Sequence, residues 1–349
     1  MRRGDFEFSL PTELIAQEPA PNRDDARLMV VERTRGTRTH ARVSELPAFL
    51  NPGDLVVVND TRVIPARVPL RTPKGRRGEL LFVRALNTPG SSPPVWLCLG
   101  KPARDLQPGV RLTLEPSTEV EIIERQGPGR YVVAWHGHTD VLTFLNCHGQ
   151  VPLPPYIRRP VGPSAADAER YQTIFARVPG SVAAPTAGLH FTPALVANLL
   201  TRGVQLARIT LHVGPGTFIP IRVDDVRLHR MEPEWCEIPT ETAEAIRAAK
   251  LEGKRVVAIG TTTTRALESA AIGEPMFVRS GVLWADRFIV PGYHFQVINA
   301  LFTNFHLPGS TLILLVAAFA GRELILESYA EAIKHRYRFY SYGDAMLVL

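Results

Sequence analysis

The sequence predicts an α/β protein, with a larger mixed α/β domain into which a small all-β domain is inserted. Between about residues 65 and 151, short runs of β-forming residues alternate with Gly and Pro at regular spacing, which indicates a small β-barrel or sandwich. After about Tyr171, candidate strands alternate with candidate helices, as they do in α/β domains. We therefore expect a discontinuous α/β domain, residues 1–64 plus 152–349, around an inserted domain of residues 65–151.

Each expected element rests on a local signal. Leu55–Val58 is an apolar run that leads into the polar turn Asn59–Arg62, which indicates a buried strand and its end. Thr240–Leu251 is rich in alanine, with Thr240 as the expected helix cap and Gly253 as the stop. The other elements expected in this domain are helices at Pro193–Arg202, Ser310–Arg322 and Ile325–Tyr337 and strands at Val204–Val213 and Arg255–Ile259. The strands expected in the insertion are Gly78–Val83, Val95–Leu99, Val110–Leu114, Val120–Ile123 and Tyr131–Trp135.

Composition indicates a globular chain without a membrane span, for which a cytoplasmic location is expected. Hydrophobic residues make up 45% and charged residues 21%, which excludes a disordered chain. The longest apolar run, Leu312–Ala320, is too short to cross a bilayer, and the first ten residues lack the apolar core of a signal peptide. The three cysteines have no CxxC spacing, so neither a disulfide framework nor a structural zinc site is indicated. One weaker alternative is a metal site formed by His136, His138, Cys147 and His148.

The basic residues agree equally with a polyanionic partner and with nucleotide bias. The formal charge is +6, and only five of the 40 basic residues are lysine. Arginine carries a planar fork that pairs well with phosphate, which agrees with an RNA partner. Nucleotide bias in the coding sequence would also enrich Arg and Pro, and charge alone does not separate these two explanations.

Three segments of the second half each place a histidine among small, polar and glycine residues. They are Gly180–Thr192, Thr210–Phe218 and Thr303–Thr311. So much Gly and Pro disfavours a helix interior, and so many hydroxyls disfavour a packed strand. Such segments suit the lining of a site, where the backbone approaches a ligand closely. Three of them in one chain predict a composite active site.

Within these segments, His190, His212 and His306 are the acid–base candidates, because imidazole titrates nearest to neutral pH. Isolated histidines are more often structural, and it is the Gly/Pro/Thr context that favours function here. Asn59 and Asn304 offer amides that can orient a base ring or a ribose hydroxyl.

Two further segments offer binding chemistry. Gly260–Arg265 (GTTTTR) follows a predicted strand and opens a predicted helix, which is the form of an anion site; a helix capped by threonine is the equally good structural explanation. Tyr340–Asp344 pairs aromatic rings with a carboxylate, a mixture that can hold a cation, and its structural alternative is a turn that ends a helix.

These strings together resemble one family, the S-adenosylmethionine:tRNA ribosyltransferase-isomerases of queuosine biosynthesis. The resemblance runs nearly from end to end of the chain. The matching strings are Asp5–Pro19, Arg23–Leu28, Leu55–Arg67, Val151–Arg158, Tyr171–Ala176, the three histidine segments, Gly260–Ser269, Thr303–Gly321 and Tyr337–Met346.

The resemblance implies a transferase and isomerase that moves the ribosyl part of S-adenosylmethionine. The acceptor would be the amine of 7-aminomethyl-7-deazaguanine at the wobble position of a tRNA, and the products would be epoxyqueuosine-tRNA, adenine and methionine. The family fold, a larger α/β domain with an inserted β-barrel, agrees with the change of pattern at residue 65. S-adenosylmethionine is then a cosubstrate, no tightly bound cofactor or metal is implied, and a monomer is expected.

We assign roles within this resemblance from the chemistry. Proton transfer is expected from His190 or His212, with His306 and Asn304 on the ribose or the leaving base. Arg265 and the threonine turn are expected to bind the methionine carboxylate, and Asp344 with Tyr342 to face the sulfonium or the acceptor amine. The full expected sets are catalytic His190, His212, His306 and Asp344, and substrate-binding Asn59, Thr61, Arg62, Ser181, Thr186, Gly214, Thr217, Thr261, Thr262, Arg265, Asn304 and Tyr342.

The sequence departs from the family pattern at two positions. Glu232 stands where the family usually has the second histidine of its His-x-Met-His-x-Glu string, so neither it nor His229 is placed in the catalytic set. Asn299 stands where the family usually has Asp, which removes a charge there.

Two other functions compete with this assignment. A methyltransferase that uses S-adenosylmethionine on tRNA would need a glycine-rich loop after the first strand of its sheet, and the sequence has none. A non-catalytic RNA-binding protein, using the barrel and the arginines of Arg71–Arg77, would not need the polar segments of the second half.

Overall fold

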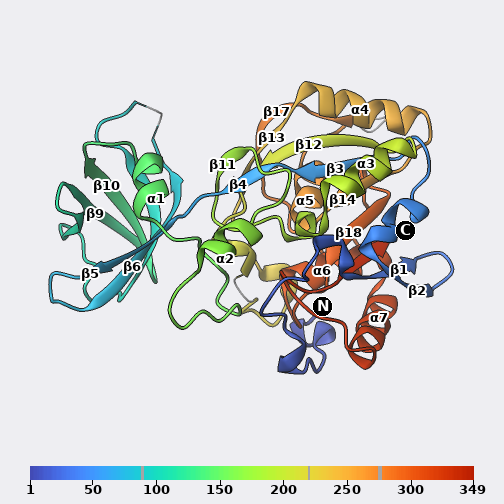
Figure 1. The fold of residues 1–349 in the computed structure, drawn as a ribbon, viewed down its shortest axis with the longest axis horizontal. Coiled ribbons are helices and arrows are strands. Elements are labelled where there is room, and N and C mark those ends of the chain that lie inside the picture. Colours follow the sequence, from blue (N-terminus) through green and yellow to red (C-terminus); the bar gives the residue numbers. More distant parts are fainter. Residues whose placement is uncertain (88–89, 219–220, 274–276) are drawn as a thin grey trace.

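The computed structural model describes residues 1–87, 90–218, 221–273 and 277–349, without the side chains of residues 217 and 218. Two sheets dominate it and lie well apart in Figure 1, one in a small body at the left and the other in a larger body at the right. The mixed α/β fold class expected from the sequence is confirmed.

The small body is a six-stranded antiparallel sheet with the strand order β5-β6-β7-β10-β9-β8. Its edge strands β5 and β8 come close together, so the sheet curls into a nearly closed barrel. The alternating residues Leu80, Phe82, Cys98, Val133 and Trp135 fill its interior. The strands are β5 (Arg67–Arg71), β6 (Arg77–Ala85), β7 (Val95–Lys101), β8 (Arg111–Glu115), β9 (Thr118–Gly127) and β10 (Arg130–Gly137), followed by helix α1 (Val141–His148).

The large body is built on a nine-stranded mixed sheet with the order β17-β13-β12-β3-β14-β18-β19-β1-β2. Its centre, β12-β3-β14-β18, is parallel, so the carboxyl ends of these four strands lie at one edge. The strands are β1 (Arg27–Glu32), β2 (Thr37–Arg42), β3 (Leu55–Asn59), β12 (Gln205–Leu211), β13 (Glu234–Ile238), β14 (Val256–Ile259), β17 (Gly281–Ala285), β18 (Ala300–Asn304) and β19 (Ala345–Val348).

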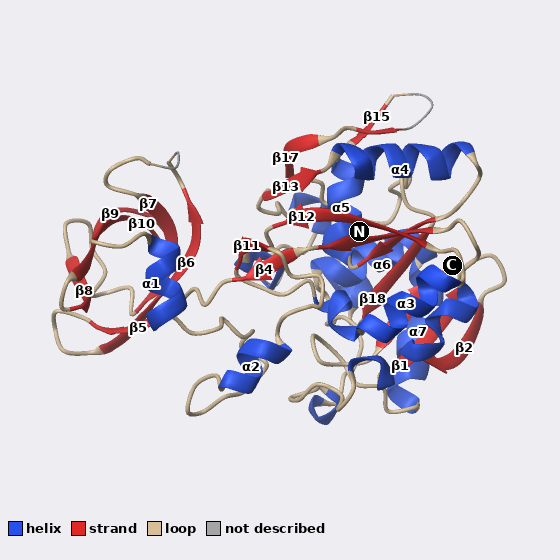
Figure 2. Ribbon diagram, turned by 45° about the horizontal axis from the view of Figure 1, so that its top comes forward, coloured by secondary structure: helices blue, strands red, loops and turns tan. Residues whose placement is uncertain are grey.

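Helices cover both faces of this sheet (Figure 2). Along β3, Leu55 and Val57 pack on one face and Val56 and Val58 on the other, which explains why a buried parallel strand reads as a continuous apolar run. One face is covered by α4 (Thr240–Leu251), α5 (Thr261–Ser269), α6 (Thr311–Ala320) and α7 (Arg322–Lys334), and the other by α3 (Pro193–Thr201).

The expected helices are present with shifted ends. Thr240 is the first residue of α4 and not its cap, because Pro239 holds the cap position without a side-chain hydrogen bond. Gly321, with φ of 93°, separates α6 from α7 and ends α6 earlier than expected. No helix among the described residues combines the length and the apolar character needed to cross a bilayer.

Two short strands join the bodies. β4 (Thr61–Val63) follows β3, and β11 (Val178–Ser181) returns beside it in parallel. Both lie between the barrel and the large sheet in Figures 1 and 2. The polar segments that leave the carboxyl ends of β3, β12, β14 and β18 therefore meet near the side of the molecule that faces the barrel. The remaining elements are α2 (Ala165–Arg170) and the small pair β15 (Ala271–Ile272) and β16 (Phe277–Val278).

Candidate functional site

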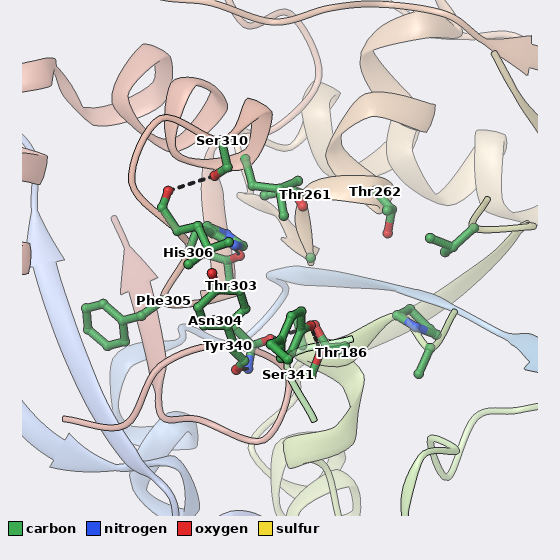
Figure 3. A pocket seen from close by; sticks show the side chains of 18 of the residues that line it. Thr186, Thr261, Thr262, Thr303, Asn304, Phe305, His306, Ser310, Tyr340 and Ser341 are labelled. Atoms are coloured by element: carbon green, nitrogen blue, oxygen red, sulfur yellow. Dashed lines mark hydrogen bonds between the residues drawn. The ribbon is translucent and has the colours of Figure 1, made fainter. Parts of the chain in front are cut away.

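A cavity of about 300 Å³, called cavity A, lies at the carboxyl ends of β14 and β18 (Figure 3). Ligand sites of open α/β sheets lie at such an edge. Parts of four expected segments line it with uncharged side chains, and the C-terminal loop closes it. Its polar lining residues are Tyr156, Thr186, Thr261, Thr262, Thr303, Asn304, His306, Ser310, Tyr340 and Ser341.

The first turns of two helices reach cavity A. α5 starts after Gly260, whose φ of 94° favours glycine, and no side chain caps this helix. α6 starts after Ser310, whose hydroxyl accepts a hydrogen bond from the N–H of Ile313. The N-terminus of a helix carries partial positive charge and free N–H groups. Two such ends at one cavity favour an anionic group of a ligand.

His306 lies on the wall of cavity A and is neutral. Its Nε2 lies 2.9 Å from the hydroxyl of Thr303, and its backbone N–H donates to the hydroxyl of Tyr329. Burial lowers the pKa of His306 to about 3. The ring is therefore suited to hydrogen bonding with an uncharged part of a ligand.

His190 lies behind cavity A and does not line it. Its Nε2 is 3.0 Å from Nδ2 of Asn304, and the Oδ1 of Asn304 accepts from the hydroxyl of Thr186 at 3.0 Å. Burial lowers the pKa of His190 to about 4, so the ring is neutral and accepts the amide N–H. His190 thus fixes the orientation of Asn304, whereas Asn304 and Thr186 line the cavity.

Tyr340 completes the wall in an unusual conformation. Its φ of 73° lies in the left-handed region, which a non-glycine residue enters at a cost of about 1–3 kcal/mol. Two backbone contacts hold it there, because its N–H donates to the carbonyl of Phe305 and its carbonyl accepts from Nδ2 of Asn304. Such strain is concentrated at functional sites in proteins.

A second cavity of about 690 Å³, called cavity B, lies between the barrel and the large body. The end of β6, residues 83–87, forms one side, and the segments that flank β12 and β13 form the other. His212 lines it, with its ring stacked on Trp235 at 4.8 Å and 17° and its Nδ1 2.8 Å from the hydroxyl of Thr61. Gly180 gives the ring room, because a Cβ there would lie 2.5 Å from its Nε2.

The charge of His212 is controlled by two opposing effects. Burial lowers its pKa to about 4, and the nearby carboxylate of Asp60 opposes that shift. His212 differs in this from His306, for which burial is the one cause of the shift. Of the two rings, His212 is better placed to carry a transient positive charge.

Cavities A and B border each other at Val213, a buried residue that lines both. The wall beside it is held by Ser181, whose hydroxyl donates to the carbonyl of Ala183 and accepts from the N–H of Val213. Ser181 is fully buried. Ser181 therefore holds the backbone between the two cavities. From the sequence, Ser181 was expected to bind substrate.

Arg265 is also placed differently from its expected role. Its NH1 donates to Glu234 at 2.6 Å, and its Nε and NH2 donate to the carbonyls of Arg287 and Ala285. The side chain is 2% exposed, so the guanidinium is committed to protein acceptors and is not free for a methionine carboxylate. Through Glu234, which also accepts from the N–H of Gly214, Arg265 supports a wall of cavity B.

Asp344 and Tyr342 do not reach either cavity. Both carboxylate oxygens of Asp344 accept hydrogen bonds from Arg27, and one also accepts from the N–H of Arg338. Tyr342 lines a separate small cavity together with Arg23 and His190. The expected contact of this pair with a sulfonium or an amine is corrected accordingly, because the carboxylate is already neutralised by Arg27.

Of the remaining expected residues, Asn59 is structural and Arg62 lies at the surface. Asn59 bridges two strands, donating to the carbonyl of Leu211 and accepting from the N–H groups of Thr61 and Leu211. Arg62 is exposed and lines another cleft, between the barrel and α2. The side chain of Thr217 lies outside the described part of the chain.

The possible metal cluster of the barrel is not assembled. His136 lies 3.5 Å from Glu121 and His148 lies 3.4 Å from Glu115, each as a separate pair. Among the described residues, the group with close ligand atoms is instead His40, Glu331 and His335, on β2 and at the end of α7. Arg38 already pairs with Glu331 there.

Both departures from the family pattern have structural partners. Glu232 lines cavity B and forms an ion pair with Arg130 of the barrel. The Oδ1 of Asn299 accepts from the N–H of Val256, which extends the pairing of β14 with β18. This contact needs an acceptor and no charge.

Sequence reasoning missed the aromatic wall of cavity B. Trp235 and Trp284 are register partners in the antiparallel pair of β13 and β17, and both line the cavity. Arg84 of β6 lies with its Cζ 5.1 Å from the Trp284 ring centroid. The one signal in the sequence was a tryptophan in a short apolar run. Such a residue does not predict a site until the strand that pairs with it is known.

The chain was compared with known proteins. A family model described as queuosine biosynthesis protein matches residues 3–348. Two proteins named S-adenosylmethionine:tRNA ribosyltransferase-isomerase are each 50% identical to this chain. The match to the protein from Geotalea uraniireducens covers 100% of both chains. The match to the protein from Thermus thermophilus covers 99% of this chain and 98% of the relative. The crystal structure of S-adenosylmethionine tRNA ribosyltransferase from Thermotoga maritima is 33% identical, covers 99% of this chain and 100% of its own, and has a TM-score of 0.55. The chain therefore belongs to the queuosine biosynthesis protein family.

Proposed function

We propose that this chain is an S-adenosylmethionine:tRNA ribosyltransferase-isomerase that works through the two adjacent cavities. It transfers and isomerises the ribosyl group of S-adenosylmethionine onto the aminomethyl group of 7-aminomethyl-7-deazaguanine in tRNA, giving epoxyqueuosine-tRNA, adenine and methionine. Full-length relatives at about half identity support the activity. The observation that supports the site is that cavity A, with its polar lining, shares the lining residue Val213 with a larger cavity that has a second set of groups.

S-adenosylmethionine occupies cavity A in this proposal. Its carboxylate lies at the first turns of α5 and α6, where Thr261, Thr262 and Ser310 line the cavity. Thr186, Asn304 and His306 hydrogen-bond with the ribose and the adenine. The neutral lining suits a sulfonium that must react, because a fixed carboxylate would stabilise that cation in the ground state.

His212 is the proposed base. A sulfonium acidifies the C5′ hydrogens of its ribose, so a base that takes one of them as a proton leaves an ylide at C5′. The ribose ring then opens, the bond to adenine breaks, and the acceptor amine attacks in its neutral form. The C5′–S bond breaks when the ribose oxygen closes the epoxide at C5′, which releases methionine. His212 is next in sequence to Val213, which lines both cavities. Asp60, which also pairs with Arg177, opposes part of the lowering of the pKa of His212. His190 acts as a positioning residue through Asn304.

Product analysis tests the activity. The purified chain is incubated with S-adenosylmethionine and a tRNA that carries 7-aminomethyl-7-deazaguanine at its wobble position. We expect adenine and methionine to be released in equal amounts and the tRNA to gain the epoxycyclopentane group, measured by chromatography and mass spectrometry. Release of S-adenosylhomocysteine would instead indicate a methyltransferase. Binding of tRNA with no consumption of S-adenosylmethionine would indicate a non-catalytic protein.

A further inference from the structure

Cavity B has the size and position of a binding site for a second substrate. Its volume of about 690 Å³ lies within the usual range of ligand pockets, roughly 300–1,000 Å³. It lies between the two bodies and shares the lining residue Val213 with cavity A. Val213 therefore marks the place, called the junction, where the two cavities border each other.

The walls of cavity B are aromatic. Trp235 and Trp284 are directly opposed in an antiparallel strand pair, so their side chains lie on the same face of the sheet. His212 covers one ring face of Trp235, whereas Trp284 is 45% exposed. An exposed indole on the wall of a pocket is a stacking surface for a flat, polarisable ligand.

Positive charge lies over this aromatic surface. The guanidinium of Arg84, from the barrel, lies over the ring of Trp284 in the large body, with its Cζ 5.1 Å from the ring centroid, so a base that stacks on this face takes the place of Arg84 and leaves it free to pair with a phosphate. Arg130, also from the barrel, pairs with Glu232 of the cavity wall, and Arg230 is exposed one residue before the lining residue Met231. Stacking surfaces flanked by arginines are the usual way in which proteins hold an unstacked base and its phosphates.

We infer that cavity B holds the target nucleobase of the RNA, stacked on Trp284, with Arg84 pairing to the adjacent phosphate. This inference rests on the proposed function, because it gives cavity A to S-adenosylmethionine and cavity B to the acceptor. The base is turned out of the anticodon loop, and its aminomethyl group points to the junction at Val213. Specificity for the base and binding of the cosubstrate are thereby separated in space.

A cycle of two changes tests the stacking. The first is Trp284→Ala in the protein, and the second is removal of the wobble base from a synthetic anticodon stem–loop, leaving an abasic site. We expect Trp284→Ala to weaken binding of the complete stem–loop roughly 5- to 150-fold, the range of stacking on one base. It should change binding of the abasic stem–loop by less than about twofold. Fluorescence anisotropy of a labelled stem–loop measures all four affinities.

Matched variants make the result specific. Val282→Ala shortens a more exposed residue of the same strand, two positions away and outside the lining of cavity B, and should leave both affinities unchanged. Trp284→Phe keeps an aromatic face and should recover part of the lost affinity. S-adenosylmethionine binding, followed by calorimetry, should be the same in all variants, which also shows that they are folded.

Two results would overturn the inference. One is equal weakening of both stem–loops by Trp284→Ala, which would indicate a backbone or shape contact and no base. The other is no weakening of either. Because the cycle measures RNA binding alone, it remains readable if the chain releases neither adenine nor methionine, so failure of the proposed activity and failure of the stacking site are distinguished.

Discussion

Cavities A and B differ in what surrounds them. Cavity A is enclosed by the large body alone, and its polar groups are neutral side chains and the ends of two helices. Cavity B is shared between the large body and the barrel, and its walls carry tryptophan, arginine and glutamate. A compact cosubstrate needs a fixed and complete site, whereas a nucleotide of a large RNA must enter from outside. In our proposal one fold meets both needs with two adjacent cavities that share the lining residue Val213.

The same comparison assigns different chemistry to the two histidines. His306 in cavity A is held neutral by burial, and His212 in cavity B is buried with Asp60 nearby. Changes at the two rings should therefore have different kinetic signatures.

His212→Ala is expected to lower kcat by roughly 10²- to 10⁴-fold, the range for a lost general base, and to leave the affinity for S-adenosylmethionine nearly unchanged. His306→Ala is expected to raise the KM for S-adenosylmethionine more than it lowers kcat, because the proposal places His306 against the bound cosubstrate. Steady-state kinetics with adenine release as the readout measures both. His229→Ala is the control, since His229 lines neither cavity. Near-normal kcat in His212→Ala would exclude it as the base.

Arg265→Ala is expected to destabilise the fold by about 3–5 kcal/mol, because it leaves the buried carboxylate of Glu234 without its cation. A residue that bound methionine would show the opposite pattern, with normal stability and a raised KM for S-adenosylmethionine. Urea unfolding, followed by circular dichroism, separates these outcomes. Arg279→Ala removes an exposed arginine and should change stability by less than about 0.5 kcal/mol.

Stability is expected to fall in weakly acidic solution. Burial lowers the pKa of His190 and His212 to about 4 and that of His306 to about 3, whereas the unfolded chain takes up these protons near pH 6.5. The unfolded state therefore binds more protons below pH 6.5, and the stability present above that pH is lost as the pH falls toward 4. The three residues together predict a loss of about 4 kcal/mol between about pH 7.5 and pH 5.5. Urea unfolding at both values measures it, and His306→Gln should remove about a third.

Much of the fold could be predicted because its signals are local. The apolar run Leu55–Val58 and the regular breaks of the insertion each reflect a strand and its turns, and Gly260 marks the start of α5 correctly. Helix ends were less predictable. Gly321 ended α6 early, and Pro239 displaced Thr240 from the cap, because backbone geometry decides these positions and composition does not.

The site was predictable as a set of segments but not as a set of contacts. All three histidine segments contribute to cavity A or cavity B, as their Gly, Pro and hydroxyl content indicated. Arg265 and Asp344 were assigned to the ligand because a charged residue near a motif suggests binding. Their actual partners, Glu234 and Arg27, are 31 and 317 residues away in sequence, so no local pattern reveals them. Trp284 was missed for the same reason, because its register partner Trp235 lies on a strand that is distant in sequence.

The smallest expected effect concerns the ion pair at the wall of cavity B. Side chains of Arg130 and Glu232 are 27% and 43% exposed, so the pair should contribute about 0–1 kcal/mol and less at high salt. Arg130→Ala is expected to raise the KM for tRNA less than about fivefold, well below the effect of Trp284→Ala, and to leave the KM for S-adenosylmethionine unchanged. A double cycle with Glu232→Ala isolates the pair. An effect of Arg130→Ala as large as that of Trp284→Ala, independent of salt, would mean that closure of the barrel over cavity B, and not stacking, holds the acceptor.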